Sequence, residues 1–296
     1  MELFLHITIV SSFGLIVGSF LTMCIYRIPR SRDDLDELIP EEVRVDEEEK
    51  VEKEESEEKH INSINDPPRS VCPKCGNQLF WYHNIPLFSW IFLLGKCGFC
   101  KAKIPIRYPL VEFLSLVAAV STFLFFGFTP TTAFIYIFLA ALIVLTFIDL
   151  DFYILPNVIT YPGVLLGLVT GLINQYTGVF ELPIVQSLLE SIIGLAMAIL
   201  LWAFAEGYFR LRGKDGLGLG DVKLIAAIGA LFGLEAAITT TILGSFLGTF
   251  GGLFFIIFAN KGWARPFPFG PYLAVACIAY LFQGKEIIEL WSTMFM

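Results

Sequence analysis

The stretch between Arg107 and Arg210 contains no lysine or arginine over 102 consecutive residues. Water-soluble folds rarely tolerate such a stretch, whereas a chain that crosses a bilayer several times needs about 20 apolar residues for each helix. The whole chain is 56% hydrophobic and 16% charged, against roughly 25% charged residues in soluble domains. The sequence therefore predicts an all-α polytopic membrane protein.

Apolar windows separated by turn residues predict about eight transmembrane helices. The expected spans are residues 3–26, 109–127, 131–149, 157–174, 184–209, 221–234, 237–260 and 268–284. The sixth is short for a complete crossing, and the brief connections between spans indicate antiparallel neighbours. The first apolar run has no basic front region and no small-residue cleavage site, so we expect a retained span and not a signal peptide.

The chain divides into three predicted parts, a first transmembrane helix at 1–26, a loop at 27–108 and a membrane-embedded core at 109–296. Within the loop, residues 33–66 form an acidic insertion and residues 70–104 form a small cysteine-containing module. Residues 33–58 hold 15 acidic and 3 basic side chains, so they contribute −12 to a net charge of −8, and the remainder sums to +4. We expect a disordered, solvated linker here. A second interpretation is an acidic lure for basic segments of a substrate.

The basic residues predict the orientation. With the N-terminus outside, 19 of the 20 lysines and arginines fall in inward-facing segments, and only Lys285 falls outside. The reverse orientation would violate the positive-inside rule almost completely. The loop is then cytosolic, and Asp149 and Asp221 both lie at cytosolic ends of their spans.

Four cysteines of the loop indicate a metal site. Cys72 and Cys75 form one C-x2-C pair, and Cys97 and Cys100 form a second pair after 21 intervening residues. This layout is typical of a structural zinc ribbon or knuckle, in which four thiolates close a tetrahedral shell and leave no open position for catalysis. The alternative is four reduced cysteines without a metal. Disulfides are disfavoured if the loop is cytosolic.

Asp149 and Asp221 are the candidate catalytic residues, because ionisable side chains at membrane depth are costly and mark functional sites. An aspartyl protease needs one ionised carboxylate to take a proton from water and one protonated carboxyl group to polarise the scissile carbonyl. Gly218 and Gly220 precede Asp221 and leave room for an extended peptide. Either aspartate alone is explained as well by helix capping at the interface, but two on one membrane side favour a catalytic pair.

Several separated blocks of the sequence, in a fixed order, carry a resemblance to a known family. The blocks are Gly18–Leu21, Tyr26–Pro29, Cys72–Cys75, Trp81–Leu87, Ser89–Trp90, Cys97–Cys100, Arg107–Glu112, Ile148–Asp151, Leu155–Asn157, Gly216–Lys223 and Pro268–Ala274. They span nearly the whole chain, which resembles the type IV prepilin peptidases, the bifunctional leader peptidase and N-methyltransferase family of bacterial inner membranes.

The resemblance implies a GxGD-type intramembrane aspartyl protease that removes the short basic leader of type IV prepilins or pseudopilins after glycine at the cytosolic membrane face. It also implies N-methylation of the new N-terminal residue, usually phenylalanine, with S-adenosylmethionine as the methyl donor. Asp149 and Asp221 correspond to the catalytic aspartates, and the choice of Asp149 over Asp151 rests on the resemblance alone. Asp151 and Lys223 are expected to support the site together with the two glycines.

The cysteine module is, by the same resemblance, the mark of the bifunctional form. The sequence shows no Gly-rich nucleotide fingerprint after a strand, so no residue is assigned to S-adenosylmethionine. We expect prepilin or pseudopilin substrates and membrane lipid as partners, in type IV pilus assembly or type II secretion, and no nucleic acid. Neither the system served nor the oligomeric state follows from the sequence.

The main alternative is an ion- or proton-coupled membrane transporter with the zinc module as a docking element, because paired acids and broken helices occur there too. Both aspartates lie at one membrane edge instead of the midplane, and no inverted repeat is visible, which disfavours it. A third hypothesis is an assembly factor without catalytic activity.

Overall fold

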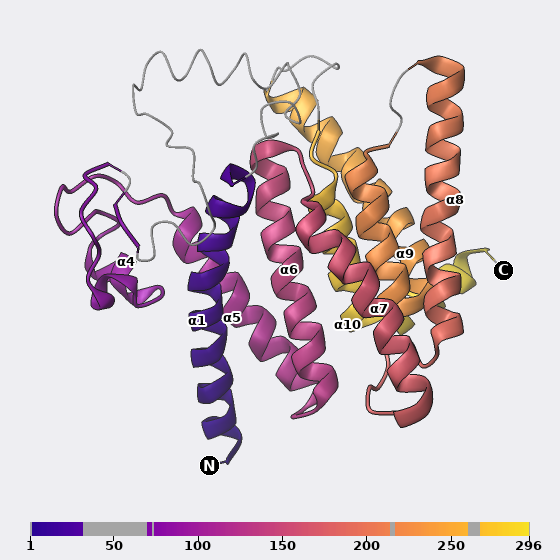
Figure 1. The fold of residues 1–296 in the computed structure, drawn as a ribbon, viewed down its shortest axis with the longest axis horizontal. Helices are drawn as coiled ribbons and strands as arrows, with labels where there is room; N and C mark the ends of the chain where they lie inside the picture. Colours follow the sequence, from indigo (N-terminus) through magenta and orange to yellow (C-terminus); the bar gives the residue numbers. More distant parts are fainter. Residues whose placement is uncertain (1, 32–69, 73, 214–216, 260–266, 296) are drawn as a thin grey trace. The chain divides into compact units, whose positions relative to one another are not determined.

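The computed structural model describes residues 2–31, 70–72, 74–213, 217–259 and 267–295, so the predicted acidic insertion at 33–66 lies outside the described residues. The elements are α1 (Glu2–Arg30), the 3-10 helix η1 (Trp81–Asn84), α4 (Phe88–Phe92), α5 (Arg107–Phe126), α6 (Pro130–Phe152), α7 (Asn157–Thr177), α8 (Leu188–Arg212), α9 (Leu219–Ala259) and α10 (Gly270–Phe295) (Figure 1). The chain forms two compact units, residues 1–144 and residues 145–296.

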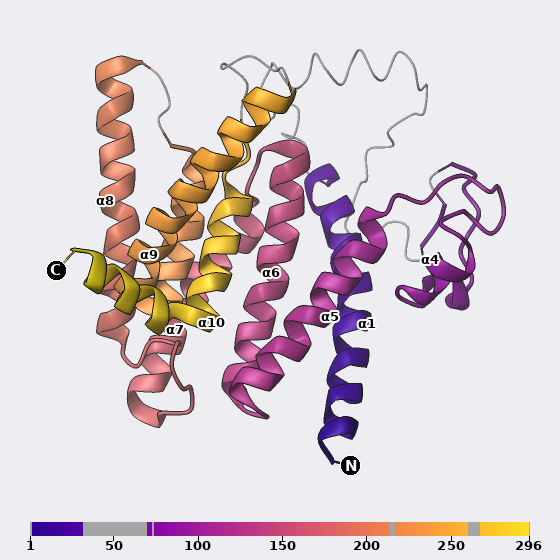
Figure 2. The ribbon, with the colours of Figure 1, turned by 180° about the vertical axis from the view of Figure 1, so that it is seen from behind.

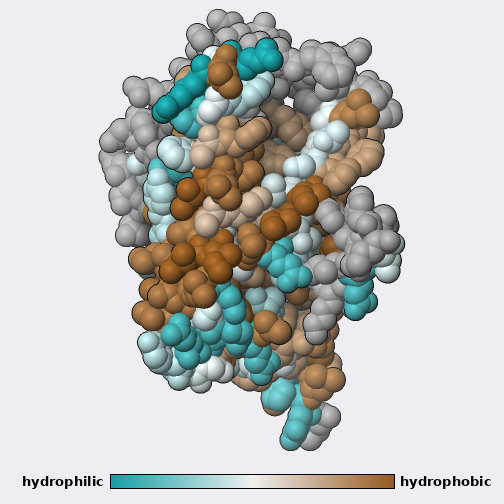
Figure 3. Space-filling model, turned by 90° about the vertical axis from the view of Figure 1, so that its right-hand side faces the viewer, coloured by the Kyte–Doolittle hydropathy of each residue, from teal (hydrophilic) through white to brown (hydrophobic). Residues whose placement is uncertain are grey.

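The helices are those of a membrane protein. Within the described residues, six of them are long and apolar enough to cross a bilayer, and Gly270–Gly284 is a shorter apolar helix. Figure 3 shows one face of the molecule, on which hydrophobic residues gather in a band between hydrophilic ends. Only helices or closed barrels satisfy the backbone inside lipid, and the all-α polytopic prediction is confirmed.

In the first unit, α1 packs closely against α5 because glycines of α1 face α5. A Cβ added at Gly18 would lie 2.7 Å from the Cα of Glu112, and one added at Gly14 would lie 2.9 Å from the Cβ of Ala119. Small residues four apart permit this approach between membrane helices. The hydroxyl of Ser115 reinforces it, since it donates to the carbonyl oxygen of Gly14 over 2.7 Å.

In the second unit, α9 packs against α7, α8 and α10. Gly194 of α8 and Gly229 of α9 face each other so closely that an added Cβ at either position would clash with the carbonyl oxygen of the other. Gly244 of α9 likewise faces Leu273 of α10, where an added Cβ would lie 2.9 Å from the leucine side chain. Figure 2 shows α10 lying along the later, gold part of α9.

Two predicted spans, 221–234 and 237–260, meet without an intervening loop. They form the single element α9, which is interrupted at Gly233, where the backbone is non-helical with φ 85° and ψ −179°. A positive φ of this kind is available to glycine at little cost. The N–H of Val185 donates to the carbonyl oxygen of Leu231 over 3.0 Å and occupies an acceptor next to the break.

Helix α8 begins later than the predicted residue 184. The hydroxyl oxygen of Ser187 accepts the N–H of Glu190, and the carboxylate of Glu190 accepts the N–H of Gln186 over 2.8 Å. These bonds satisfy N–H groups that a helix start leaves without intrahelical partners. At its other end, Gly213 adopts the left-handed conformation and closes α8.

Helix α10 extends past the predicted end at residue 284 to Phe295. It is interrupted at Gln283, where the backbone is non-helical, and Figure 2 shows α10 changing direction toward the C-terminus. The predicted span 268–284 therefore corresponds to the first, apolar part of the element.

Candidate active site and metal site

Asp149 lies in the last turn of α6 and is 5% exposed. Its Oδ2 atom accepts the N–H of Gly270, the first residue of α10, over 2.9 Å. The N–H groups of a first helical turn have no intrahelical partner and favour negative charge. Helix α6 ends just beyond, because Tyr153 takes a positive φ of 57° and donates its N–H to the carbonyl oxygen of Asp149.

Gly270 is fitted to this carboxyl group. A Cβ added at this position would lie 2.8 Å from Oδ2 and 3.2 Å from Cγ of Asp149. Any other residue would therefore displace the carboxyl group that its own N–H holds. The helix start and the absence of a side chain act together to place Asp149.

Asp221 lies in the first turn of α9 and is half-buried. A Cβ added at Gly218 would lie 2.7 Å from Oδ2 of Asp221, so the bare glycine makes room for the carboxyl group. Acidic side chains in a first helical turn are favoured by the helix dipole.

Leu155 connects the surroundings of the two aspartates. A Cβ added at Gly220 would lie 3.0 Å from the Cβ of Leu155, and one added at Gly270 would lie 3.3 Å from its Cδ2. The carboxyl groups of Asp149 and Asp221 are themselves close enough to interact electrostatically. The structure thus brings together the two carboxyl groups that the sequence separates by more than seventy residues.

Asp151 has a different environment from Asp149, because it is partly exposed. The two aspartates are two positions apart, so on an α-helix their side chains are rotated by about 200° about the helix axis. The buried carboxyl group beside Gly270 and Asp221 is that of Asp149.

Lys223 links α9 to α7. Its Nζ donates to Oδ1 of Asn157 over 2.8 Å and lies 5.1 Å from the centre of the Tyr161 ring. The lysine holds the start of α9, and so Asp221, next to the start of α7.

Three residues beside the aspartates were not assigned a role from the sequence. They are Gly270, which donates to Asp149, Leu155, which packs on Gly220, and Asn157, which binds Lys223. Each falls inside a sequence block that was noted, Leu155–Asn157 or Pro268–Ala274. These blocks were the only indication in the sequence that the three residues belong to the site, because their contacts join distant parts of the chain.

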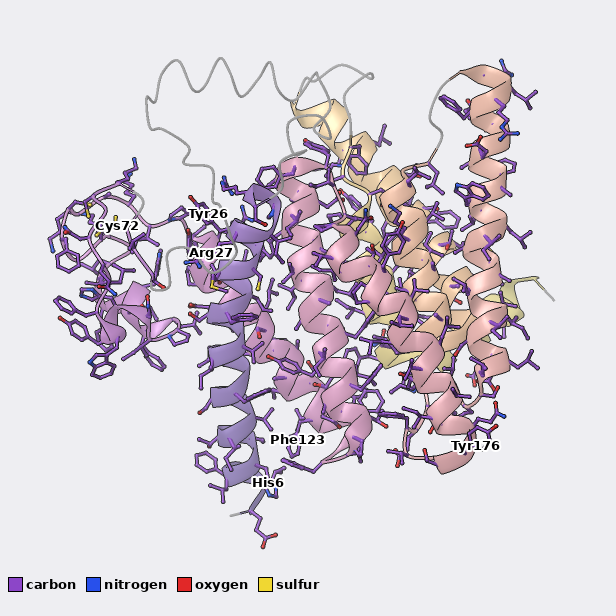
Figure 4. The ribbon with its side chains drawn as sticks, in the orientation of Figure 1. His6, Tyr26, Arg27, Cys72, Phe123 and Tyr176 are labelled. Atoms are coloured by element: carbon purple, nitrogen blue, oxygen red, sulfur yellow. The ribbon has the colours of Figure 1, made fainter. Side chains whose placement is uncertain are left out.

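The four loop cysteines converge. Their Sγ atoms all lie within 4.8 Å of one another, and this group could hold a metal ion. The Sγ atoms of Cys72 and Cys100 are 3.9 Å apart. Figure 4 shows Cys72 inside the small module, with other sulfur atoms drawn beside it in yellow.

The two C-x2-C pairs lie in turns of the same design. The N–H of Cys72 donates to Asn77 and its carbonyl oxygen accepts from Gly76, while Cys97 makes the equivalent bonds to Ala102 and Lys101. The fourth residue after each first cysteine takes a positive φ, 68° at Gly76 and 59° at Lys101. Isolated β-bridges flank both turns, Val71 with Gln78 and Lys96 with Lys103.

Backbone N–H groups favour thiolates in this cluster. Hydrogen bonds from the N–H groups of Cys100 and Phe99 lower the pKa of Cys97 to about 7, and the N–H of Asn77 lowers the pKa of Cys75. Burial raises the pKa of Cys72 to about 11. Metals bind the thiolate form, so the hydrogen bonds of the turns favour metal binding by Cys75 and Cys97. A bound cation would offset the cost of burying the Cys72 thiolate.

Comparison with known proteins gives two family matches. Residues 12–126 match the Bacterial Peptidase A24 N-terminal domain, and residues 136–253 match the Type IV leader peptidase family. No solved structure matches the chain significantly.

Curated relatives cover nearly the whole chain. A prepilin leader peptidase/N-methyltransferase of Aeromonas hydrophila is 34% identical over 99% of this chain and 96% of the relative. Proteins of the same name from Aeromonas salmonicida and Pseudomonas aeruginosa are 35% and 33% identical, over 96% and 94% of this chain and 92% and 90% of the relatives.

Proposed function

Because the chain belongs to the type IV leader peptidase family, we propose that it removes the leader of prepilins or pseudopilins with Asp149 and Asp221 and then N-methylates the new N-terminus. The observation that supports the assignment best is the convergence of two buried or half-buried carboxyl groups at the ends of α6 and α9. The relatives' shared name supports an enzyme over the transporter alternative.

The geometry suits the acid and base roles of an aspartyl protease. Two carboxyl groups that interact, one buried and one half-buried, favour sharing one proton, because two negative charges held together are costly. The ionised partner takes a proton from water, and the protonated partner polarises the scissile carbonyl. The N–H of Gly270 fixes Oδ2 of Asp149 and leaves Oδ1 for the water, while Gly218 makes room for the carboxyl group of Asp221.

The order of the helices supports a common membrane side for the two aspartates. Asp149 ends α6, Asp221 begins α9, and the two helices α7 and α8 lie between them in the chain. Two crossings return the chain to the side from which it left. The protein is a multi-pass inner-membrane protein, and we propose that its N-terminus is outside and that the aspartates and the cysteine module are cytosolic, as the distribution of lysine and arginine supports.

For the cysteine module we propose a structural zinc ion. Zinc–sulfur bonds of about 2.3 Å in a tetrahedron place the sulfur atoms about 3.8 Å apart, close to the 3.9 Å between Cys72 and Cys100. Four thiolates fill the shell, so the metal stabilises the fold of the module and takes no part in peptide cleavage. Metal analysis of the purified protein should find about one zinc per chain.

For N-methylation we propose the reaction but no binding residues. S-adenosylmethionine, when bound, supplies the methyl group for the new amino terminus. Within the described residues we find no arrangement that identifies its binding site, such as a Gly-rich turn between a strand and a helix. We therefore assign no residue to this cofactor.

The test is cleavage of a prepilin by the full-length protein in a bilayer, with three matched variants. We expect Asp149→Asn and Asp221→Asn each to slow leader removal by about 10²- to 10⁴-fold, the usual contribution of a positioned proton-transfer group. Asp151→Asn is the comparison, because a supporting residue outside the carboxyl pair should slow cleavage far less than either catalytic aspartate. Unchanged cleavage in both of the first two variants would refute the aspartyl assignment, and no cleavage by the unmodified protein would favour an assembly factor.

A further inference from the structure

The cysteine module exposes a large number of apolar side chains. We call this set the aromatic face and define it by seven exposed residues, Phe80, Trp81, Tyr82, Phe88, Ile91, Phe92 and Leu94. Trp81 is 78% exposed, and Phe92 and Leu94 are each 81% exposed. Exposed apolar patches of this kind mark protein or membrane interaction sites.

Trp90, unlike these exposed residues, packs against the backbone of the module. The indole N–H of Trp90 donates to the carbonyl oxygen of Ile104 over 3.2 Å, and a Cβ added at Gly95 would lie 3.0 Å from the Trp90 ring. Leu87 and Leu94, on either side of this segment, take positive φ values of 59° and 51°. Leucine rarely adopts this conformation, so the outward orientation of the aromatic face is a defined part of the fold.

A backbone hydrogen bond fixes the depth of this face relative to α5. The N–H of Leu87 donates to the carboxylate of Glu112 over 2.7 Å. Glu112 lies five residues into α5, which is about 7.5 Å along the helix axis. The interfacial region of one leaflet is about 6 Å thick. With the first residue of α5 taken as the outer edge of the headgroup layer, a segment bonded to Glu112 lies at the boundary between headgroups and hydrocarbon.

The figures agree with this placement. Figure 4 shows Cys72 level with Tyr26 and Arg27, near the end of α1 that lies farthest from His6. Figure 1 shows α4, which begins just after Leu87, on the side of the module nearer to the middle of α1. Helix α4 therefore lies on the side of the metal cluster that is nearer to the middle of α1.

The start of α5 is also apolar and exposed, and the module is positively charged. Ile106, Leu110 and Phe113, at the start of α5, are exposed as a lipid-facing surface requires. Residues 70–106 contain four lysines and no aspartate or glutamate. Tryptophan and tyrosine favour the membrane interface, and lysines near it attract anionic headgroups.

We propose that the aromatic face is a membrane anchor, which inserts into the leaflet at which α5 begins and holds the cysteine module against the phospholipid surface. The inference does not depend on the catalytic assignment. The positive charge of the module, four lysines and no acidic residue in residues 70–106, suits an anionic bilayer and repels a basic leader, so the charge favours lipid over substrate as the occupant. The anchor would keep the module at the depth where a substrate helix leaves the membrane.

Quenching of Trp81 by brominated lipid tests the anchor. Full-length protein is reconstituted in bilayers of phosphatidylcholine and phosphatidylglycerol, with or without bromine at carbons 6 and 7 of the acyl chain. The emission of Trp81 is the difference between the unmodified protein and Trp81→Phe. Trp202 of α8, which is 47% exposed, is measured in the same way through Trp202→Phe as a lipid-facing control.

We expect brominated lipid to remove at least half of the Trp81 emission, as for Trp202, and acrylamide in water to remove little of it. Strong quenching by acrylamide with none by bromine would overturn the proposal. The proposal is also wrong if bromine leaves Trp81 unaffected and saturating prepilin protects it from acrylamide, since the face would then dock substrate.

A second variant tests the face itself. Ile91→Asp combined with Phe92→Asp places two charges on the exposed side of α4, and we expect bromine quenching of Trp81 to fall at least twofold while the metal content stays unchanged. Unchanged quenching with unchanged metal content would contradict insertion through this face. Loss of the metal would show that the double variant has unfolded the module. The proposal is then tested by the bromine quenching of Trp81 in the unmodified protein.

Discussion

Replacing Gly270 by alanine should damage the proposed site while leaving the fold in place. The new Cβ would lie 2.8 Å from Oδ2 of Asp149, about 0.6 Å closer than the 3.4 Å at which ordinary contact begins. Leu155 borders the same space, with its Cδ2 atom 3.3 Å from the new methyl group. The carboxyl group must therefore move away from the N–H of residue 270 that now holds it at 2.9 Å.

The expected loss follows from that hydrogen bond. A hydrogen bond to a charged group contributes about 1.5–3 kcal/mol, and each 1.36 kcal/mol is a factor of ten. Gly270→Ala should therefore lower kcat for leader removal roughly 10- to 150-fold. KM should change little, because the change lies at the carboxyl group and not along the peptide. Alanine favours helix over glycine by up to about 1 kcal/mol, so thermal unfolding should occur near the unmodified temperature.

Gly207→Ala is the matched control, because Gly207 lies within α8 and a Cβ added there meets nothing within 4 Å. It should retain full activity. Both variants are reconstituted with a prepilin, the cleaved fraction is followed by mass spectrometry, and Tm is measured on the same samples. A Gly270→Ala protein that cleaves at the unmodified rate would show that this N–H does not hold a reacting carboxyl group.

Four further variants test the metal site, the packing of α8 on α9, and the bond between Leu87 and Glu112. Cys97→Ser should reduce bound zinc from about one per chain to nearly none, because one thiolate of the shell is lost; metal analysis would contradict this if the ratio stayed at one. Gly194→Ala should lower Tm by several degrees, because its methyl group forces α8 and α9 apart, and a Tm equal to that of Gly207→Ala would refute the packing argument. Glu112→Ala should leave the N–H of Leu87 unpaired, at a cost of about 1–3 kcal/mol, and speed proteolysis of the module. Glu112→Gln keeps an acceptor oxygen and should be cleaved by protease more slowly than Glu112→Ala. Equal proteolysis rates of the two variants would contradict the role of this bond.

Hydropathy located most of the helices because lipid leaves the backbone few alternatives. The second to fourth predicted spans, at 109–127, 131–149 and 157–174, lie within three residues of α5, α6 and α7 at each end. The sixth and seventh predicted spans meet between residues 234 and 237, and the structure breaks α9 at Gly233. The sequence could not show that no loop separates these two spans. The break depends on the conformation of Gly233 and on the packing of Val185 beside it.

The choice between Asp149 and Asp151 shows where sequence reasoning stopped. The two side chains point to nearly opposite sides of α6, so knowing the buried side would have decided between them. Helix α6 is apolar all round and has no polar stripe to mark that side. The structure places Asp149 inside, next to Gly270, a residue 121 positions away in the sequence.

The position of the carboxyl pair at helix ends has a physical reason. In the middle of a membrane helix every N–H is bonded to a carbonyl oxygen of the same helix, so none is available to a neighbouring acid. A helix start leaves four N–H groups without such partners, and Gly270 supplies one of them to Asp149. Water reaches the ends of spans and not their centres. Helix termini therefore suit a pair of carboxyl groups in a helical membrane protein, and glycines at 218, 220 and 270 let those termini pack closely against the two carboxyl groups and Leu155.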